Sequence, residues 1–92
     1  MTLKNDKIMR SELYQALVKL ETVEEAEKFL EDLCTIKELE AMSQRLRAAK
    51  MLLAGKTYNE VVEETEISSA TLARVSKCVR YGDGGYKSIL EK

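Results

Sequence analysis

The fold of this chain is decided by residues 57–81, which read TYNEVVEETEISSATLARVSKCVRY. Thr57 followed by Glu60 is a capping box, which predicts a short helix that continues through about Thr65. A tight turn comes next, and a second helix then runs to about Tyr81. Because the connection is too short for a long antiparallel hairpin, it favours two crossed helices, and we predict a helix-turn-helix.

The second helix of this motif has two chemically different faces. Leu72, Val75 and Val79 recur at i, i+3 and i+7, so we predict that they point into the protein. The opposite side then carries small and basic residues and no acid: Ser69, Ala70, Ala73, Arg74, Lys77 and Arg80. Small side chains allow close approach to a DNA groove, and arginine and lysine donate hydrogen bonds to base edges. This helix is therefore the candidate recognition helix.

The turn between the two helices departs from the usual pattern. Glu66 stands where many such motifs have glycine, which leaves the geometry of the turn open. Ile67 is expected to fill the turn, and Val61 and Val62 are expected to supply apolar contacts from the first helix. Either Ser68 or the serine after it caps the second helix.

A long central helix is predicted over residues 35–55. Thr35 opens it, with a glutamate at the third helical position, and Gly55 is a natural C-terminal stop. The apolar residues expected along one side are Ile36, Leu39, Met42, Leu46, Ala49 and Leu53.

The remaining segments are also predicted to be helical, because proline is absent and glycine occurs only four times. One helix is expected from about Lys4 to Val18, and a second begins at the Thr22 cap. Residues 86–91 form a last short helix, in which Ile89 and Leu90 point inward. The prediction is one all-α domain of six helices over residues 1–92, in which residues 1–34 are dimerisation helices.

The net charge of −1 hides a segregated distribution. Residues 1–44 hold six bases and ten acids, a net charge of −4. Residues 45–59 hold four bases and no acid, residues 60–66 hold four acids, and residues 67–92 hold five bases and two acids. Local potential governs attraction to phosphate, so the overall acidity does not exclude DNA binding.

The sequence contains few features of zinc-binding proteins, membrane or secreted proteins, or enzymes. There is no histidine, and Cys34 and Cys78 are isolated, so a zinc site is not expected. Neither an apolar run long enough to cross a membrane nor a signal-peptide pattern occurs, and we expect a cytoplasmic protein with reduced thiols. Without metal ligands or an activated nucleophile, we do not expect an enzyme.

Three runs in fixed order resemble the Trp repressor family, and in particular its YerC/YecD-type group. They are Arg45-Leu46-Arg47, Leu52-Leu53-Ala54-Gly55 and Ser69-Ala70-Thr71-Leu72-Ala73-Arg74. The resemblance extends over about residues 22–80. It implies an intertwined all-α homodimer that binds an operator with two-fold symmetry.

The resemblance also implies a corepressor pocket between the long helix and the recognition helix. Carried over by position, its residues are Arg45, Arg74 and Cys78, with Thr71 beside them. Arginine there can grip a carboxylate or stack on a flat ring. The alternative is that both arginines contact DNA phosphates or pair with nearby acids. Cys78 replaces a serine hydroxyl, which argues against tryptophan as the ligand.

Two functions are open at this point. The first is a transcriptional regulator, of repressor type by the resemblance, in which Arg45, Arg47, Lys56 and Arg80 contact phosphates of double-stranded DNA. The second is a protein–protein interaction module that uses the helix-turn-helix surface without DNA, which the acidic first helix of the motif favours. Tyr58 and Tyr81 either reach the DNA backbone or pack at the edge of the core.

Overall fold

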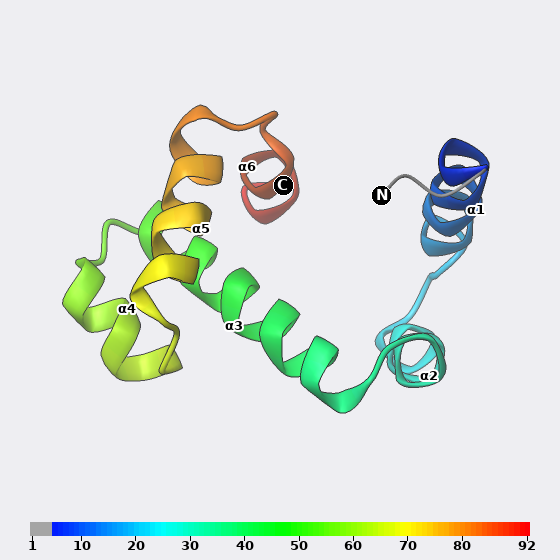
Figure 1. The fold of residues 1–92 in the computed structure, drawn as a ribbon, viewed down its shortest axis with the longest axis horizontal. Coiled ribbons are helices and arrows are strands. Elements are labelled where there is room, and N and C mark those ends of the chain that lie inside the picture. Colours follow the sequence, from blue (N-terminus) through cyan, green and yellow to red (C-terminus); the bar gives the residue numbers. More distant parts are fainter. Residues whose placement is uncertain (1–4) are drawn as a thin grey trace. The chain divides into compact units, whose positions relative to one another are not determined.

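Every secondary-structure element in the computed structural model, which describes residues 5–92, is a helix. The helices are α1 (Asp6–Leu17), α2 (Val23–Leu33), α3 (Ile36–Leu53), α4 (Tyr58–Thr65), α5 (Ser69–Tyr81) and α6 (Gly85–Leu90) (Figure 1). The predicted all-α class with six helices is therefore confirmed. The expected start of the first helix, at about Lys4, lies outside the described residues. The chain divides into two units, residues 1–35 and residues 36–92.

The first unit consists of α1 and α2, in which no apolar side chain is fully buried. Thr22 caps α2 as predicted, because its side chain accepts a hydrogen bond from the Glu25 N–H at 3.1 Å. Neither helix contains a buried residue, and Ile8, Val18 and Val23 expose most of their surface. Apolar surface concentrated in this way is typical of a region that another molecule covers.

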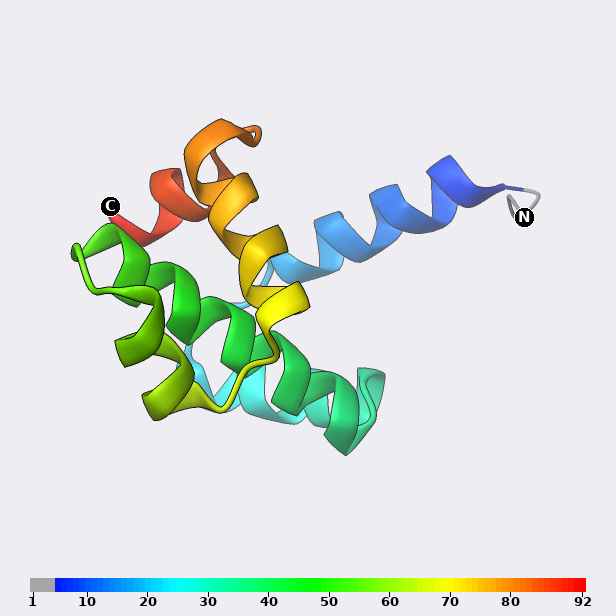
Figure 2. The same ribbon diagram turned by 60° about the vertical axis from the view of Figure 1, so that its left-hand side comes forward.

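The second unit is built around α3, which contacts α4, α5 and α6 (Figure 1). The turned view shows α5 crossing α3 (Figure 2). The small side chains of Ala48 and Ala49 are fully buried, which allows helices to approach α3 closely. The buried core consists of Ala48, Ala49, Met51, Val61, Ile67, Leu72 and Val75.

The buried face of α3 differs from the predicted one. Of the six residues expected along it, only Ala49 belongs to the core, whereas Ile36 is 76% exposed and Leu46 is 46% exposed. The later helices pack instead against the side that carries Ala48 and Met51. A helix with apolar residues on several sides does not itself specify which side its neighbours meet, and tertiary packing made the choice.

Two pairs of adjacent residues differ in burial, and the inward orientation predicted for Ile89 is wrong. Val61 is fully buried, but the adjacent Val62 is 39% exposed, because successive residues lie about 100° apart on a helix. Leu90 packs against the core as predicted, whereas Ile89 is 64% exposed. In each pair, one residue faces the core and its neighbour does not.

The helix-turn-helix begins with the predicted capping box. The Thr57 hydroxyl accepts a hydrogen bond from the Glu60 N–H at 3.2 Å, and the Glu60 carboxylate accepts one from the Thr57 N–H at 3.0 Å. At the second helix, the choice between the two serines is settled in favour of Ser68, whose hydroxyl accepts a hydrogen bond from the Thr71 N–H at 3.2 Å. Local hydrogen bonds thus fix both helix starts.

The turn has the left-handed backbone geometry that glycine usually supplies. Glu66 lies at φ 59° and ψ 20°, and its N–H donates to the Val62 carbonyl oxygen at 2.8 Å. A residue with a side chain is strained by about 1–2 kcal/mol in this region. The glutamate therefore keeps the geometry of the motif at a cost in stability.

Replacing Glu66 with glycine is expected to raise the free energy of unfolding by about 0.5–1 kcal/mol. Glycine removes the left-handed strain, and this gain exceeds its greater loss of backbone entropy on folding. Chemical denaturation at one fixed protein concentration measures the change. Glu63→Gly is the control, since it lies inside α4 and should instead lower stability by about 1 kcal/mol. Equal destabilisation by both changes would contradict the strain argument.

The capping box should also make stability depend on pH. The hydrogen bond from the Thr57 N–H, and then the one from its hydroxyl, lower the pKa of Glu60 below its ordinary value. The resulting stabilisation is present above the unfolded-state pKa and disappears as the pH falls through the folded-state pKa. We therefore expect Glu60→Gln to lose less stability than the native chain on acidification, measured by denaturation at neutral pH and at about pH 3. Glu63→Gln is the matched control and should follow the native chain.

Candidate nucleic-acid interface

The recognition-helix candidate, α5, has the two faces that its sequence predicts. Leu72 and Val75 are buried and Val79 is half-buried against the core. The opposite side is open to solvent along the helix, where the exposed residues are Ser69, Ala70, Ala73, Arg74, Lys77 and Arg80. The second unit therefore presents a free convex helix face of small and basic side chains.

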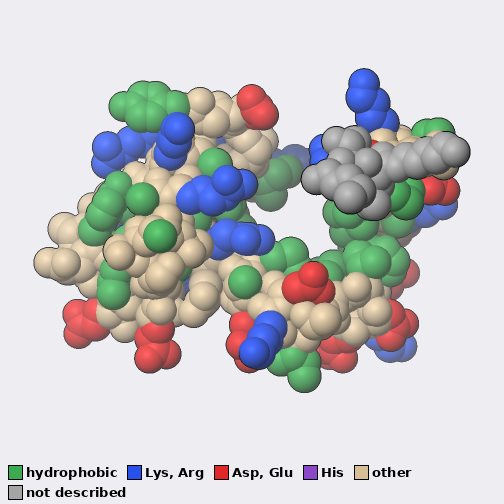
Figure 3. All heavy atoms as spheres, in the orientation of Figure 1, with side chains coloured by type: hydrophobic (Ala, Val, Ile, Leu, Met, Phe, Trp, Pro, Cys, Tyr) green, Lys and Arg blue, Asp and Glu red, His purple; other side chains and the backbone are tan. Residues whose placement is uncertain are grey.

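Charge is separated between the two helices of the motif. α5 contains Arg74, Lys77 and Arg80 and no acid, whereas α4 contains three glutamates and no base. In the space-filling view, lysine and arginine side chains gather over α5, and acidic side chains lie at the lower edge, over α4 (Figure 3). A polyanion is therefore attracted to the side of the motif that α5 occupies.

Three basic residues outside α5 were also predicted to contact phosphate. Lys56 is exposed between α3 and α4, and Arg45 is half-buried on α3. Arg47 is exposed, and its guanidinium donates to the Glu64 carboxylate of α4 at 2.6 Å. An exposed pair of this kind is weak and exchanges readily, but it gives Arg47 a competing partner.

Hydrogen bonds that the sequence analysis did not identify hold the motif in shape. Gln44 Nε2 on α3 donates to the Thr65 carbonyl oxygen at 3.0 Å, which ties the end of α4 to the central helix. Tyr58 Oη at the start of α4 donates to Ser76 Oγ on α5. Ser76 is four residues after Leu72, on the inward side, so its spacing was a usable indication of burial.

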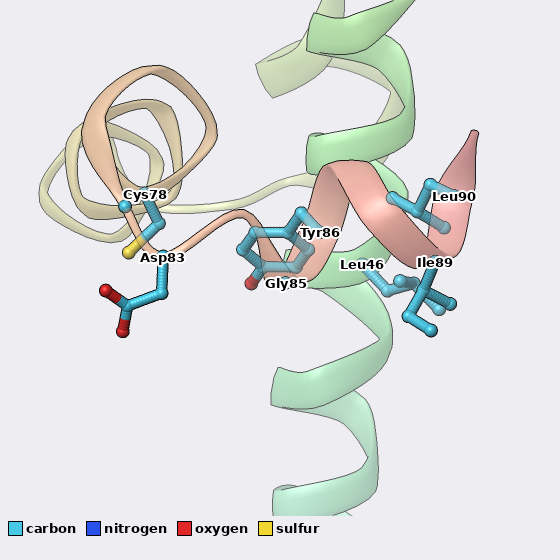
Figure 4. A pocket seen from close by; sticks show the side chains of 8 residues that line it. Leu46, Cys78, Asp83, Gly85, Tyr86, Ile89 and Leu90 are labelled. Atoms are coloured by element: carbon cyan, nitrogen blue, oxygen red, sulfur yellow. The ribbon is translucent and has the colours of Figure 1, made fainter. Parts of the chain in front are cut away.

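Only one of the four residues expected around a corepressor, Cys78, lines the apolar cavity next to α6. Cys78 borders a cavity of about 570 Å³ together with Leu46, Gly82, Asp83, Gly85, Tyr86, Ile89 and Leu90. In Figure 4, the Tyr86 ring lies between the end formed by Cys78 and Asp83 and the apolar end near α3. Arg45, Thr71 and Arg74 do not line this cavity. The corepressor pocket stays a prediction.

The match to known proteins covers most of the chain. Residues 10–92 match the family model described as Trp repressor protein. The chain belongs to the Trp repressor family. Over 81 residues it is 40% identical to the uncharacterized protein YerC of Bacillus subtilis (strain 168), covering 88% of this chain and 78% of YerC.

Solved structures agree with membership of the Trp repressor family. A candidate Trp repressor from Staphylococcus aureus is 37% identical, with a TM-score of 0.86, over 97% of this chain and 92% of its own. A TrpR-like protein from Eubacterium eligens is 42% identical, with a TM-score of 0.83, over 88% of this chain and 84% of its own. The resemblance to a YerC-type Trp-repressor-related protein and to the corresponding fold is thereby confirmed.

Family and fold support a DNA-binding regulator as the general class of function, since the Trp repressor family is regulatory and not enzymatic. Among residues 5–92, every helix is too short or too polar to span a bilayer. The same residues contain no cluster of three or more side chains suited to holding a metal ion.

Proposed function

We propose that this chain is a transcriptional repressor that binds a specific, two-fold symmetric operator as a homodimer. The observation that carries the proposal is the exposed, acid-free face of α5. In the proposed complex, five residues of this face lie toward the major groove: Ser69, Ala70, Ala73, Arg74 and Lys77. Four basic residues contact phosphates, which position the protein without reading sequence: Arg45, Arg47, Lys56 and Arg80.

The dimer is proposed because α1 and α2 contain no buried residue. Residues 1–34 serve as dimerisation helices whose apolar side chains are covered by the second copy. The rest of the domain then consists of the central helix (residues 35–55), the helix-turn-helix (residues 57–81) and the C-terminal helix (residues 86–91). A two-fold dimer would carry its two recognition helices about 34 Å apart, one turn of DNA.

Fluorescence anisotropy with duplex DNA at two salt concentrations tests the proposal. Binding should weaken steeply as salt rises, because each phosphate contact releases counterions. Selection of bound sequences from random duplexes should return a palindromic consensus. Absence of binding at low salt, or affinity that does not respond to salt, would exclude DNA as the partner.

A second candidate function is a protein-interaction module, which the acidic α4 favours. Its three glutamates make α4 a poor neighbour for DNA phosphates and a suitable surface for a basic protein. In that case, glutamine replacement of Glu63 and Glu64 should abolish partner binding, whereas changes on α5 should not.

A further inference from the structure

A polar cavity of about 370 Å³ lies where the end of α3, the start of α4 and the C-terminal half of α5 meet. All of these elements belong to the second unit. Leu52 and Val79 give the cavity an apolar part. The other residues that line it are Gly55, Lys56, Thr57, Tyr58, Ser76 and Arg80.

The charged groups of this cavity are both cations. Lys56 comes from the α3–α4 connection and Arg80 from α5, and no lining residue is a carboxylate. Neither forms one of the ion pairs found in residues 5–92. Lys56 also lines a different hollow with Glu60, Glu63 and Glu64, and the Thr57 cap holds the Glu60 carboxylate. Asp83, three residues after Arg80, lines the cavity at Cys78. The charged side chains that line the cavity itself are therefore basic.

Two hydroxyl groups add neutral hydrogen-bonding capacity. Tyr58 Oη donates to Ser76 Oγ, and Ser76 is only 4% exposed. This bond joins the start of α4 to α5 and keeps both hydroxyls at the cavity wall. Since Ser76 Oγ accepts this bond, its own proton is left to donate. Two cations beside a hydroxyl donor are groups that proteins present to phosphate oxygens.

We propose that this cavity is the seat of one phosphate group, held between the Lys56 ammonium and the Arg80 guanidinium. The inference rests on the proposed DNA-binding function and deepens it, since the phosphate is that of the operator backbone. Arg80 lies six residues after Arg74 on α5, which corresponds to about 9 Å along the helix axis. The phosphate seat therefore lies beside the residues that face the groove, where the DNA backbone runs.

The test uses operator duplexes in which single phosphates are replaced by neutral methylphosphonates. The native chain should bind about a hundredfold more weakly when one phosphate of each half-site is neutral, because one charge-assisted hydrogen bond, worth about tenfold, is lost in each half-site. Lys56→Gln combined with Arg80→Gln should bind native DNA more weakly and show no sensitivity at that phosphate. The slope of log affinity against log salt should fall by about 0.9 for each phosphate that the variant no longer binds.

Lys50→Gln combined with Lys87→Gln is the matched control, because it removes the same charge at exposed residues outside the cavity. The affinity of the control variant should still fall when that phosphate is replaced by a methylphosphonate. If neutral phosphates weaken binding by the Lys56/Arg80 variant as much as they weaken binding by the native chain, the proposed phosphate site is wrong, although the chain still binds DNA. If the native chain binds no duplex, the proposed function itself fails.

A second measurement separates backbone phosphate from free phosphate. Inorganic phosphate is titrated into the native chain against chloride at equal ionic strength, and the backbone amide resonances of Tyr58 and Ser76 are followed by NMR. Saturable shifts that vanish in the Lys56/Arg80 variant support a seat that also takes free phosphate. Absent shifts together with the methylphosphonate effect support the DNA backbone alone. Absence of both effects overturns the inference.

Discussion

Reversing the charge of Arg74 and Lys77 together is expected to reduce operator affinity by about a thousandfold or more. Both side chains lie exposed on the acid-free face of α5, and a dimer presents each of them twice. Each hydrogen-bonded interaction with a base edge contributes about 1–3 kcal/mol, so removing four of them costs at least about 4 kcal/mol. Arg74→Glu with Lys77→Glu should show this weakening by anisotropy at low salt.

The control for charge reversal changes the same net charge elsewhere in the second unit. Lys50→Glu with Lys87→Glu alters two exposed residues outside the α5 face, and its affinity should fall far less. Circular dichroism and denaturation establish that both variants are folded. Similar reductions in the two variants would mean that overall charge, and not the α5 face, directs binding.

Shortening Val61 to alanine is expected to lower the free energy of unfolding by about 2–3 kcal/mol. Val61 is fully buried in the core formed with α3 and α5. The destabilisation combines the transfer free energy of the deleted methyl groups with the cost of the cavity that remains. Chemical denaturation at a fixed protein concentration measures it, because dimerisation would make stability depend on concentration.

Val62→Ala provides a matched comparison within the same helix. Val62 is 39% exposed, so the identical substitution should cost less than about 0.5 kcal/mol. Alanine also has the higher helix propensity, which offsets part of the destabilisation. If the two substitutions cost the same, the described orientation of α4 is incorrect.

Local signals in the sequence were enough to define the helices of the second unit and most of its proposed interface. Thr57 and Ser68 cap their helices as the pattern predicts, because a cap needs only groups within three residues of each other. Leu72 and Val75 are buried because a short helix with one apolar stripe has one way to face a core. With that stripe inward, the exposed positions of α5 followed directly.

Local sequence patterns could not predict which side chains of different helices contact one another. The corepressor pocket of Arg45, Thr71, Arg74 and Cys78, which the resemblance implies, stays a prediction; the cavity at Cys78 is completed by α6 and is not lined by the other three. It also gave no indication that Arg47 pairs with an acid of α4. Contacts of this kind depend on the positions of side chains that are distant in sequence, and periodicity carries no information about those positions.

The sequence by itself determined the helical class, the helix limits, the caps and the inward stripe of α5, because each depends on residues a few positions apart. Tertiary structure alone decided that Ala48 and Met51 form the core side of α3 and that Val61 is buried whereas Val62 is partly exposed. It also brought Tyr58 to Ser76 beside Lys56 and Arg80. The physical reason is that a helix turns its side chains in every direction, and only the arrangement of its neighbours selects which of them are buried or brought together.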